Sequence, residues 1–216
     1  MRYIYQLWRR FQYAIATLAC AIAAAIIIWA DVYPLLAPNR PIPDADALVI
    51  EGWMPDYAIE AAAAEFHRGH YRFIVTLGSA VTHNKYFIGY KTFADLSAAT
   101  LATLGVDPDK IVALPYSLVS VKRTATAAIA LGQWLQDADI SLKSITLCSL
   151  GPHARRSWDL YRDALMPEIQ VGVLSLTPQD YEPSCWWRTS SGARIVVGEM
   201  IAYTHHCLSR RLNQVL

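Results

Sequence analysis

The sequence predicts an α/β protein: a Rossmann-like three-layer sandwich around a mainly parallel sheet of about five strands, preceded by one N-terminal transmembrane helix. Two observations carry this prediction. Between residues 46 and 210, short apolar runs alternate with amphipathic segments of helical period, a pattern typical of a parallel sheet covered on both faces. Ahead of them, residues 11–30 contain no charged side chain. The 216 residues suit one such helix and one domain.

The uncharged run predicts a membrane anchor at residues 1–30. A helix over residues 11–30 is about 30 Å long, which matches the hydrocarbon thickness of a bilayer, so the lipid bilayer is its expected partner. Arg2, Arg9 and Arg10 precede the run and Asp31 follows it, which predicts a cytoplasmic N-terminus and an extracytoplasmic domain.

A cleaved signal peptide is the alternative for the same run. A signal peptide has an apolar core of about 7 to 15 residues. The uncharged run of this chain is longer and continues through Ile26, Ile27 and Ile28, which disfavours cleavage. A lipoprotein signal at Cys20 is disfavoured because apolar residues continue beyond the cysteine.

Residues 31–45 form a proline-rich spacer, and residues 46–210 form the α/β domain. The domain holds three cysteines without CxxC spacing, which argues against a disulfide framework and a zinc site. A Cys185–Cys207 pair stays open, although buried free thiols are favoured.

Five strands are expected where short apolar runs precede a turn: Ala47 to Ile50, Phe73 to Leu77, Ile111 to Leu114, Ser144 to Cys148 and Val171 to Leu176. Five helices are expected where the apolar spacing is helical: Tyr57 to Arg68, Tyr90 to Leu104, Thr124 to Gln136, His153 to Leu165 and Gly192 to Leu208. Gly69 ends the first of these helices, and Gly105 ends the second.

Polar residues that follow the strands are the candidate site residues, because ligands bind beyond the carboxyl ends of parallel strands. The candidate catalytic residues are His153 and Glu51. The candidate ligand-binding residues are Gly52, Trp53, Asp56, Gly78, Ser79, Arg123, Thr124, Ser149, Arg155 and Arg156.

The strongest signal is the His153-Ala154-Arg155-Arg156 segment, which opens a helix directly after a strand. Cations in the first helical turn oppose the helix dipole, which favours a bound anion such as a phosphate or carboxylate. The dipole also disfavours an imidazolium, which suits His153 as a neutral base. Capping or packing remains the alternative for His153, and dipole compensation remains the alternative for Glu51.

Other motifs point away from several classes of function. The sequence has no HxxxH or DxD pattern for a metal, no G-x-S-x-G elbow and no G-x-G-x-x-G fingerprint, and its net charge of +1 does not favour nucleic acid. His83, Lys85, His205 and His206 are expected at the surface. Trp186 and Trp187 are expected to lock the last helix onto the sheet, with an apolar wall near the ligand as the alternative.

The segments DALVIEGW, TLGS, TLGVDPDKI, RTATAA and LGPHARRSWDLY occur in this order from about residue 46 to residue 208, with WWR near the end. In their order and spacing they resemble the ElyC/SanA/YdcF family of bacterial envelope proteins, in a divergent branch. The resemblance implies a Rossmann-like domain, a single-pass anchor in the bacterial inner membrane and a periplasmic location. More typical members have a glycine-rich turn where this chain has Glu51-Gly52-Trp53, and T-x-E-N where it has Thr124 to Ala127. The cofactor stays unknown.

Two functions are expected from these observations. The first is an envelope protein that acts on an anionic, phosphorylated or lipid-linked precursor of envelope polysaccharide. In it, Arg123, Arg155 and Arg156 hold the anion while His153 and Glu51 supply acid–base chemistry. The second is a non-enzymatic ligand-binding or scaffolding protein with envelope protein partners.

Overall fold

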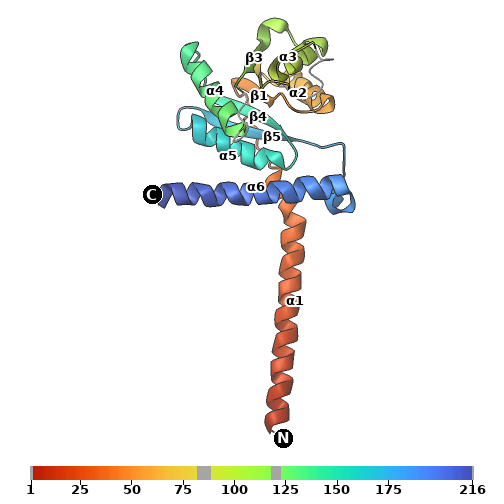
Figure 1. Ribbon diagram of the computed structural model, residues 1–216. Helices are drawn as coiled ribbons and strands as arrows, with labels where there is room; N and C mark the ends of the chain where they lie inside the picture. Colours follow the sequence, from red (N-terminus) through yellow and green to blue (C-terminus); the bar gives the residue numbers. More distant parts are fainter. Residues whose placement is uncertain (1, 82–88, 118–122, 216) are drawn as a thin grey trace.

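A five-stranded parallel sheet forms the centre of the domain in the computed structural model, which describes residues 2–81, 89–117 and 123–215 (Figure 1). The strands are β1 (Ala47–Glu51), β2 (Phe73–Gly78), β3 (Ile111–Pro115), β4 (Ser144–Leu150) and β5 (Gln170–Leu176). Their order in the sheet is β3-β2-β1-β4-β5, and every neighbouring pair is parallel. The predicted α/β fold with a five-stranded parallel sheet is therefore confirmed.

The helices follow the predicted order, with shifts of one to three residues at most ends and an extension of seven residues beyond Leu208 at the end of the last helix. They are α1 (Arg2–Leu36), α2 (Asp56–Arg68), α3 (Phe93–Thr103), α4 (Arg123–Asp137), α5 (His153–Leu165) and α6 (Ser190–Val215), with short 3₁₀ turns η1 (Pro108–Lys110) and η2 (Pro183–Arg188). α3 begins three residues later than predicted because the Thr92 side chain caps it, accepting a hydrogen bond from the Asp95 backbone N–H at 3.1 Å.

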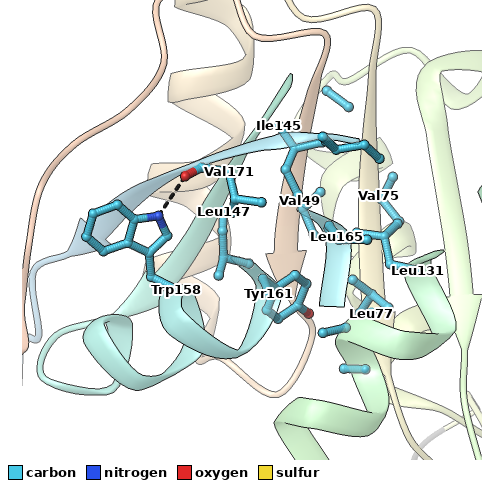
Figure 2. Close-up of a cluster of buried hydrophobic side chains, with 14 of the residues drawn as sticks. Val49, Val75, Leu77, Leu131, Ile145, Leu147, Trp158, Tyr161, Leu165 and Val171 are labelled. Atoms are coloured by element: carbon cyan, nitrogen blue, oxygen red, sulfur yellow. Dashed lines mark hydrogen bonds between the residues drawn. The ribbon is translucent and has the colours of Figure 1, made fainter. Parts of the chain in front are cut away.

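Alternate residues of the strands pack against different helices, which gives the three layers. On β1, Leu48 and Ile50 belong to the cluster that includes α2 and α3, whereas Ala47 and Val49 belong to the cluster that includes α4 and α5. Figure 2 shows the second cluster, where the Trp158 indole donates a hydrogen bond to the Val171 carbonyl at 2.6 Å. By the same alternation, the next residue of β1, Glu51, lies on the α4 and α5 side.

The chain reverses its direction across the sheet between β3 and β4. It runs from β1 to β2 and β3 on one side, and it returns to add β4 and β5 on the other side of β1. The carboxyl ends of β1 and β4 consequently border the topological switch point, where open α/β sheets bind ligands.

α1 differs from the predicted anchor. A bilayer crossing needs a helix that is both about 20 residues long and apolar throughout. Among the residues that the structure describes, no helix combines the length and the apolarity that a crossing requires. The predicted transmembrane helix at residues 11–30 is therefore wrong. The same finding corrects the predicted location as a single-pass inner-membrane protein with a cytoplasmic N-terminus and a periplasmic domain.

The C-terminal end of α1 instead packs on the protein itself. The helix extends six residues into the predicted spacer 31–45, and Val32 and Leu36 are buried in a cluster with Trp186 and Val196. Figure 1 shows α1 projecting from the domain where it meets α6. The centroids of the Trp186 and Trp29 rings lie 4.4 Å apart. Trp186 therefore packs between α1 and α6 and does not lock α6 onto the sheet as predicted.

The rest of the spacer lies along the edge of the sheet. The Arg40 backbone N–H donates to the Val173 carbonyl at 2.7 Å, and the Val173 N–H donates back to Arg40 at 3.0 Å. This antiparallel bridge covers part of the exposed edge of β5.

Candidate functional site

The strand register places Glu51 beside Ser149. The β1–β4 pairs run from Ala47↔Ile145 to Ile50↔Cys148, so the residues that follow the last pair are Glu51 and Ser149. The Ser149 hydroxyl donates to Glu51 Oε2 at 2.5 Å, and the Ser157 hydroxyl of α5 donates to Glu51 Oε1 at 3.0 Å. The side chain of Glu51 is thus held from two elements, and the residue is only 3% exposed.

His153 is the first residue of α5 and faces Glu51. A turn at Gly151, with φ of 49°, leads from β4 into this helix, and a left-handed φ of this kind favours glycine. The His153 Nε2 atom lies 3.8 Å from Glu51 Oε1, and Nδ1 lies 2.8 Å from Glu199 Oε1. The Trp53 ring meets the imidazole edge-on, with 5.1 Å between ring centroids. The imidazole therefore stands between two carboxylates.

Glu199 of α6 is held by Arg156 as well as by His153. The Arg156 guanidinium donates from Nε to Oε2 at 3.0 Å and from Nη2 to Oε1 at 3.1 Å. Burial opposes ionisation of Glu199, but the hydrogen bonds and charges of His153 and Arg156 outweigh it and lower the pKa of Glu199 from 4.5 to about 2. Glu199 is consequently an ionised carboxylate at neutral pH.

These side chains line a cavity of about 590 Å³ at the carboxyl ends of the strands. A cavity of this size fits a small-molecule ligand. The walls come from the loops after the strands, from the first turns of α4 and α5, and from one face of α6. The lining residues used below are Glu51, Trp53, Ser79, Tyr116, Arg123, Thr124, His153, Arg156, Asp180, Arg194 and Glu199.

The cations available to a ligand are not the ones that the HARR segment predicted. Arg156 lines the cavity but is paired with Glu199. Arg155 does not line it: its Nε donates to the Tyr203 hydroxyl at 3.1 Å, and Asp159 lies 3.6 Å away. Arg123 of α4 and Arg194 of α6 line the cavity and are exposed. Among the described residues, no hydrogen bond or ion pair involves either of these two arginines.

Tyr116 adds a polar group to the wall between Ser79 and Arg123. Burial and the nearby charge of Glu51 raise the pKa of Tyr116, while a hydrogen bond with Ser79 and the charge of Arg123 act in the opposite direction. The phenol is therefore neutral at physiological pH and can donate or accept a hydrogen bond.

The other predicted site residues differ in whether they line the cavity. Gly78, Ser79 and Thr124 line the cavity, whereas Gly52 does not. Gly78 also serves backbone packing, since a Cβ there would lie 2.2 Å from the Ala94 nitrogen. Asp56 begins α2 and does not line the cavity. His83 and Lys85 lie outside the described residues, and Cys185 and Cys207 are both free.

Glu199, Arg194, Asp180 and Tyr116 are the site residues described above that the sequence reasoning missed. Glu199 stands in the otherwise apolar run from Ile195 to Tyr203, and an isolated carboxylate there is the signal that could have identified it. Arg194 and Asp180 carry no comparable signal, because both are exposed charged residues, which are common on any protein surface.

The arrangement suits proton transfer next to a bound anion. It offers an imidazole with one nitrogen fixed by a carboxylate, a second buried carboxylate near the other nitrogen, and two exposed arginines. Within the described ranges, no three acidic, histidine or cysteine side chains cluster as metal ligands would. Comparison with protein-family models, curated proteins and solved structures finds no match to this chain.

Proposed function

We propose that this protein is an enzyme that performs acid–base chemistry on a phosphorylated or otherwise anionic small molecule bound in the cavity. The observation that carries the proposal is the placement of His153: Nδ1 lies 2.8 Å from Glu199, and Nε2 faces Glu51 at 3.8 Å. A histidine fixed in this way by a carboxylate is the usual arrangement of a general base. Glu51 is the second proton-transfer group, held in place by Ser149 and Ser157.

The anion-binding part of the proposal rests on Arg123 and Arg194. They reach the cavity from α4 and α6, and the first turn of α4 adds the positive end of a helix dipole. Guanidinium groups bind phosphate and carboxylate oxygens with charge-assisted hydrogen bonds. Arg156 instead supports the site through Glu199.

The resemblance of EGW, RTATAA and LGPHARRSWDLY to the ElyC/SanA/YdcF family supports a sugar-phosphate precursor of envelope polysaccharide as the substrate class. The exposed Trp53 ring beside His153 supports it too, because an aromatic face at a cavity mouth offers apolar contact area to a ring-shaped ligand.

Ligand binding is tested by thermal shift of the full chain with inorganic phosphate, glucose 1-phosphate and a nucleotide sugar. We expect stabilisation that grows with ligand concentration and is lost in Arg123→Gln and Arg194→Gln. Arg155→Gln is the matched control, since Arg155 does not line the cavity, and it should keep the shift. Equal shifts in all three variants would refute the assigned anion site.

Catalysis is tested with the ligand that gives the largest shift. Turnover followed by ³¹P NMR should fall by about 10² to 10⁴-fold in His153→Gln and in Glu51→Gln, while binding is retained. Retention of turnover in both variants would refute the acid–base mechanism. Binding without turnover in the wild type would identify a ligand-binding protein instead.

A further inference from the structure

We infer that Glu199 is a positioning residue that fixes the tautomer of His153, and that Arg156 reverses this tautomer when Glu199 is removed. The inference deepens the proposed function, because its catalytic meaning rests on His153 acting as the base. Its structural content is independent of any ligand. It follows from the two groups that meet the same ring nitrogen.

His153 Nδ1 has two neighbours with opposite demands. Glu199 Oε1 lies 2.8 Å from Nδ1, and Arg156 Nη2 lies 3.0 Å from it. A carboxylate can only accept, so it requires a proton on Nδ1, whereas a guanidinium can only donate, so it requires a lone pair there. Both hydrogen bonds cannot form with the same tautomer.

Glu199 determines the tautomer of His153 because it also accepts hydrogen bonds from the Arg156 guanidinium. Two donors of Arg156 are directed at Glu199, from Nε at 3.0 Å and from Nη2 at 3.1 Å. The carboxylate is ionised, in keeping with its lowered pKa, and it makes the shortest of the contacts to the ring. The neutral imidazole therefore donates from Nδ1 to Glu199 and keeps a lone pair on Nε2.

This tautomer is the one that a base in the cavity needs. The Nε2 lone pair points to the side of Glu51, whose Oε1 at 3.8 Å is too distant for a direct hydrogen bond. Nε2 is therefore free to take a proton from a substrate, and the resulting imidazolium would lie between two carboxylates. With the other tautomer, Nε2 would carry a proton and could not act as a base.

When Glu199 is removed, Arg156 instead of Glu199 should determine the tautomer of His153. In Glu199→Ala, Arg156 loses the acceptor of two hydrogen bonds, and its Nη2 remains next to Nδ1. The guanidinium then donates to Nδ1, which forces the proton to Nε2. In the double variant Glu199→Ala with Arg156→Ala, neither neighbour is present and the two tautomers should coexist.

The experiment is long-range ¹H–¹⁵N NMR of the full chain labelled at histidine, at about pH 9, where an ordinary imidazole is neutral. His153→Asn assigns the His153 signals among those of the six histidines. We expect the Nδ1–H form in the wild type, the Nε2–H form in Glu199→Ala with a change of at least about tenfold in tautomer ratio, and a mixture in the double variant. Glu199→Gln should keep the Nδ1–H form, because its amide oxygen can still accept.

An Nε2–H form in the wild type would overturn the inference, and so would an unchanged tautomer in Glu199→Ala. If the alanine variant fails to fold, the wild-type spectrum and that of the isosteric Glu199→Gln still decide it. The tautomer is read without substrate, so its outcome is separate from the proposed function. The expected spectra together with full turnover by His153→Gln would refute the proposed role of His153 as the base and leave the tautomer assignment standing.

Discussion

At the scale of single residues, the site depends on how two carboxylates are accommodated, Glu51 being buried and Glu199 half-buried. Glu51 receives its hydrogen bonds from two serine hydroxyls, whereas Glu199 is paired with a guanidinium and an imidazole. Neutral donors leave the charge of Glu51 unbalanced locally, while Arg156 balances that of Glu199. The two carboxylates therefore respond differently to mutation.

Replacement of Glu51 by alanine should lower the free energy of unfolding by about 1 to 3 kcal/mol, because the buried hydroxyls of Ser149 and Ser157 lose their acceptor. Glu51→Gln should cost less, since its amide oxygen can still accept. Urea unfolding at pH 7 measures both values. An alanine variant as stable as the wild type would show that these hydroxyls find other partners.

The stability contributed by Glu199 should depend on pH. Its folded-state pKa of about 2 lies below the ordinary 4.5, so the ionised form is stabilised by folding, and this contribution is present above about pH 4.5 and lost as the pH falls toward 2. Glu199→Gln should therefore be less stable than the wild type by about 1 to 3 kcal/mol at pH 7, and the difference should shrink below pH 4.5.

The measurement is chemical unfolding of both proteins between pH 7 and about pH 2.5. Glu60→Gln serves as control, because Glu60 is exposed on α2, and its effect should stay within about 0.5 kcal/mol at every pH. A constant difference between Glu199→Gln and the wild type across this range would contradict the assigned pairing.

At the scale of elements, close backbone contacts hold the loops that form the cavity. A Cβ on Gly78, at the end of β2, would lie 2.2 Å from the Ala94 nitrogen and 2.6 Å from the Phe93 carbonyl carbon. The first turn of α3 therefore rests directly on the end of the strand. Only glycine permits this contact, which fixes the wall that contains Ser79.

Gly78→Ala should destabilise the protein by about 1 to 3 kcal/mol, because backbone must move to admit the methyl group. The matched control is Gly198→Ala in α6, where nothing lies within 4 Å of the added Cβ. That change should stabilise the protein by about 0.4 to 1 kcal/mol through better helix propensity. Thermal or urea unfolding compares the two, and a neutral Gly78→Ala would contradict the close packing.

At the scale of the whole molecule, α1 and the site share α6. Trp186 of η2 is 1% exposed and packs on Trp29, and α6 carries both Val196 of the same buried cluster and Glu199 of the cavity. α6 is also tied to α5 through the Tyr203 hydroxyl, which accepts from Arg155 and donates to Asp159 at 3.2 Å. The position of Glu199 thus depends on contacts at both ends of the chain.

Trp186→Ala should loosen this junction, because loss of a buried indole costs about 3 to 5 kcal/mol. Amide hydrogen exchange of the full chain should rise in η2 and in the first half of α6 more than in β1. Trp187 is 45% exposed, so Trp187→Ala is the matched control with little effect. Equal exchange in both variants would show that Trp186 does not anchor α6.

Local pattern was sufficient for the order and type of the elements. Each strand and helix of the domain has its own period of apolar residues, and the carboxyl ends of parallel strands necessarily meet at one edge. Local pattern therefore placed Glu51 and His153 at the same edge, but their contact depends on β1 and β4 being neighbours in the sheet, which only the structure shows. The uncharged run at residues 11–30 was misleading, because absence of charge over 20 residues is not sufficient: among the described residues, no helix is both long and apolar enough to cross a membrane.

The sequence by itself determined the parallel sheet and the edge that carries the polar groups, with His153 and Glu51 among them, whereas the contact between these two residues came from the structure. Only the tertiary structure decided which arginines face the cavity. Contacts between residues far apart in the sequence produce no periodic pattern that could be recognised in either segment. Glu199 lies 43 residues after Arg156 along the chain, yet its carboxylate pairs with the Arg156 guanidinium, which the sequence analysis had assigned to an anionic ligand. The proposed anion site consequently keeps the predicted Arg123 and gains Arg194 in place of Arg155 and Arg156, because Arg123 of α4 and Arg194 of α6 line the same cavity.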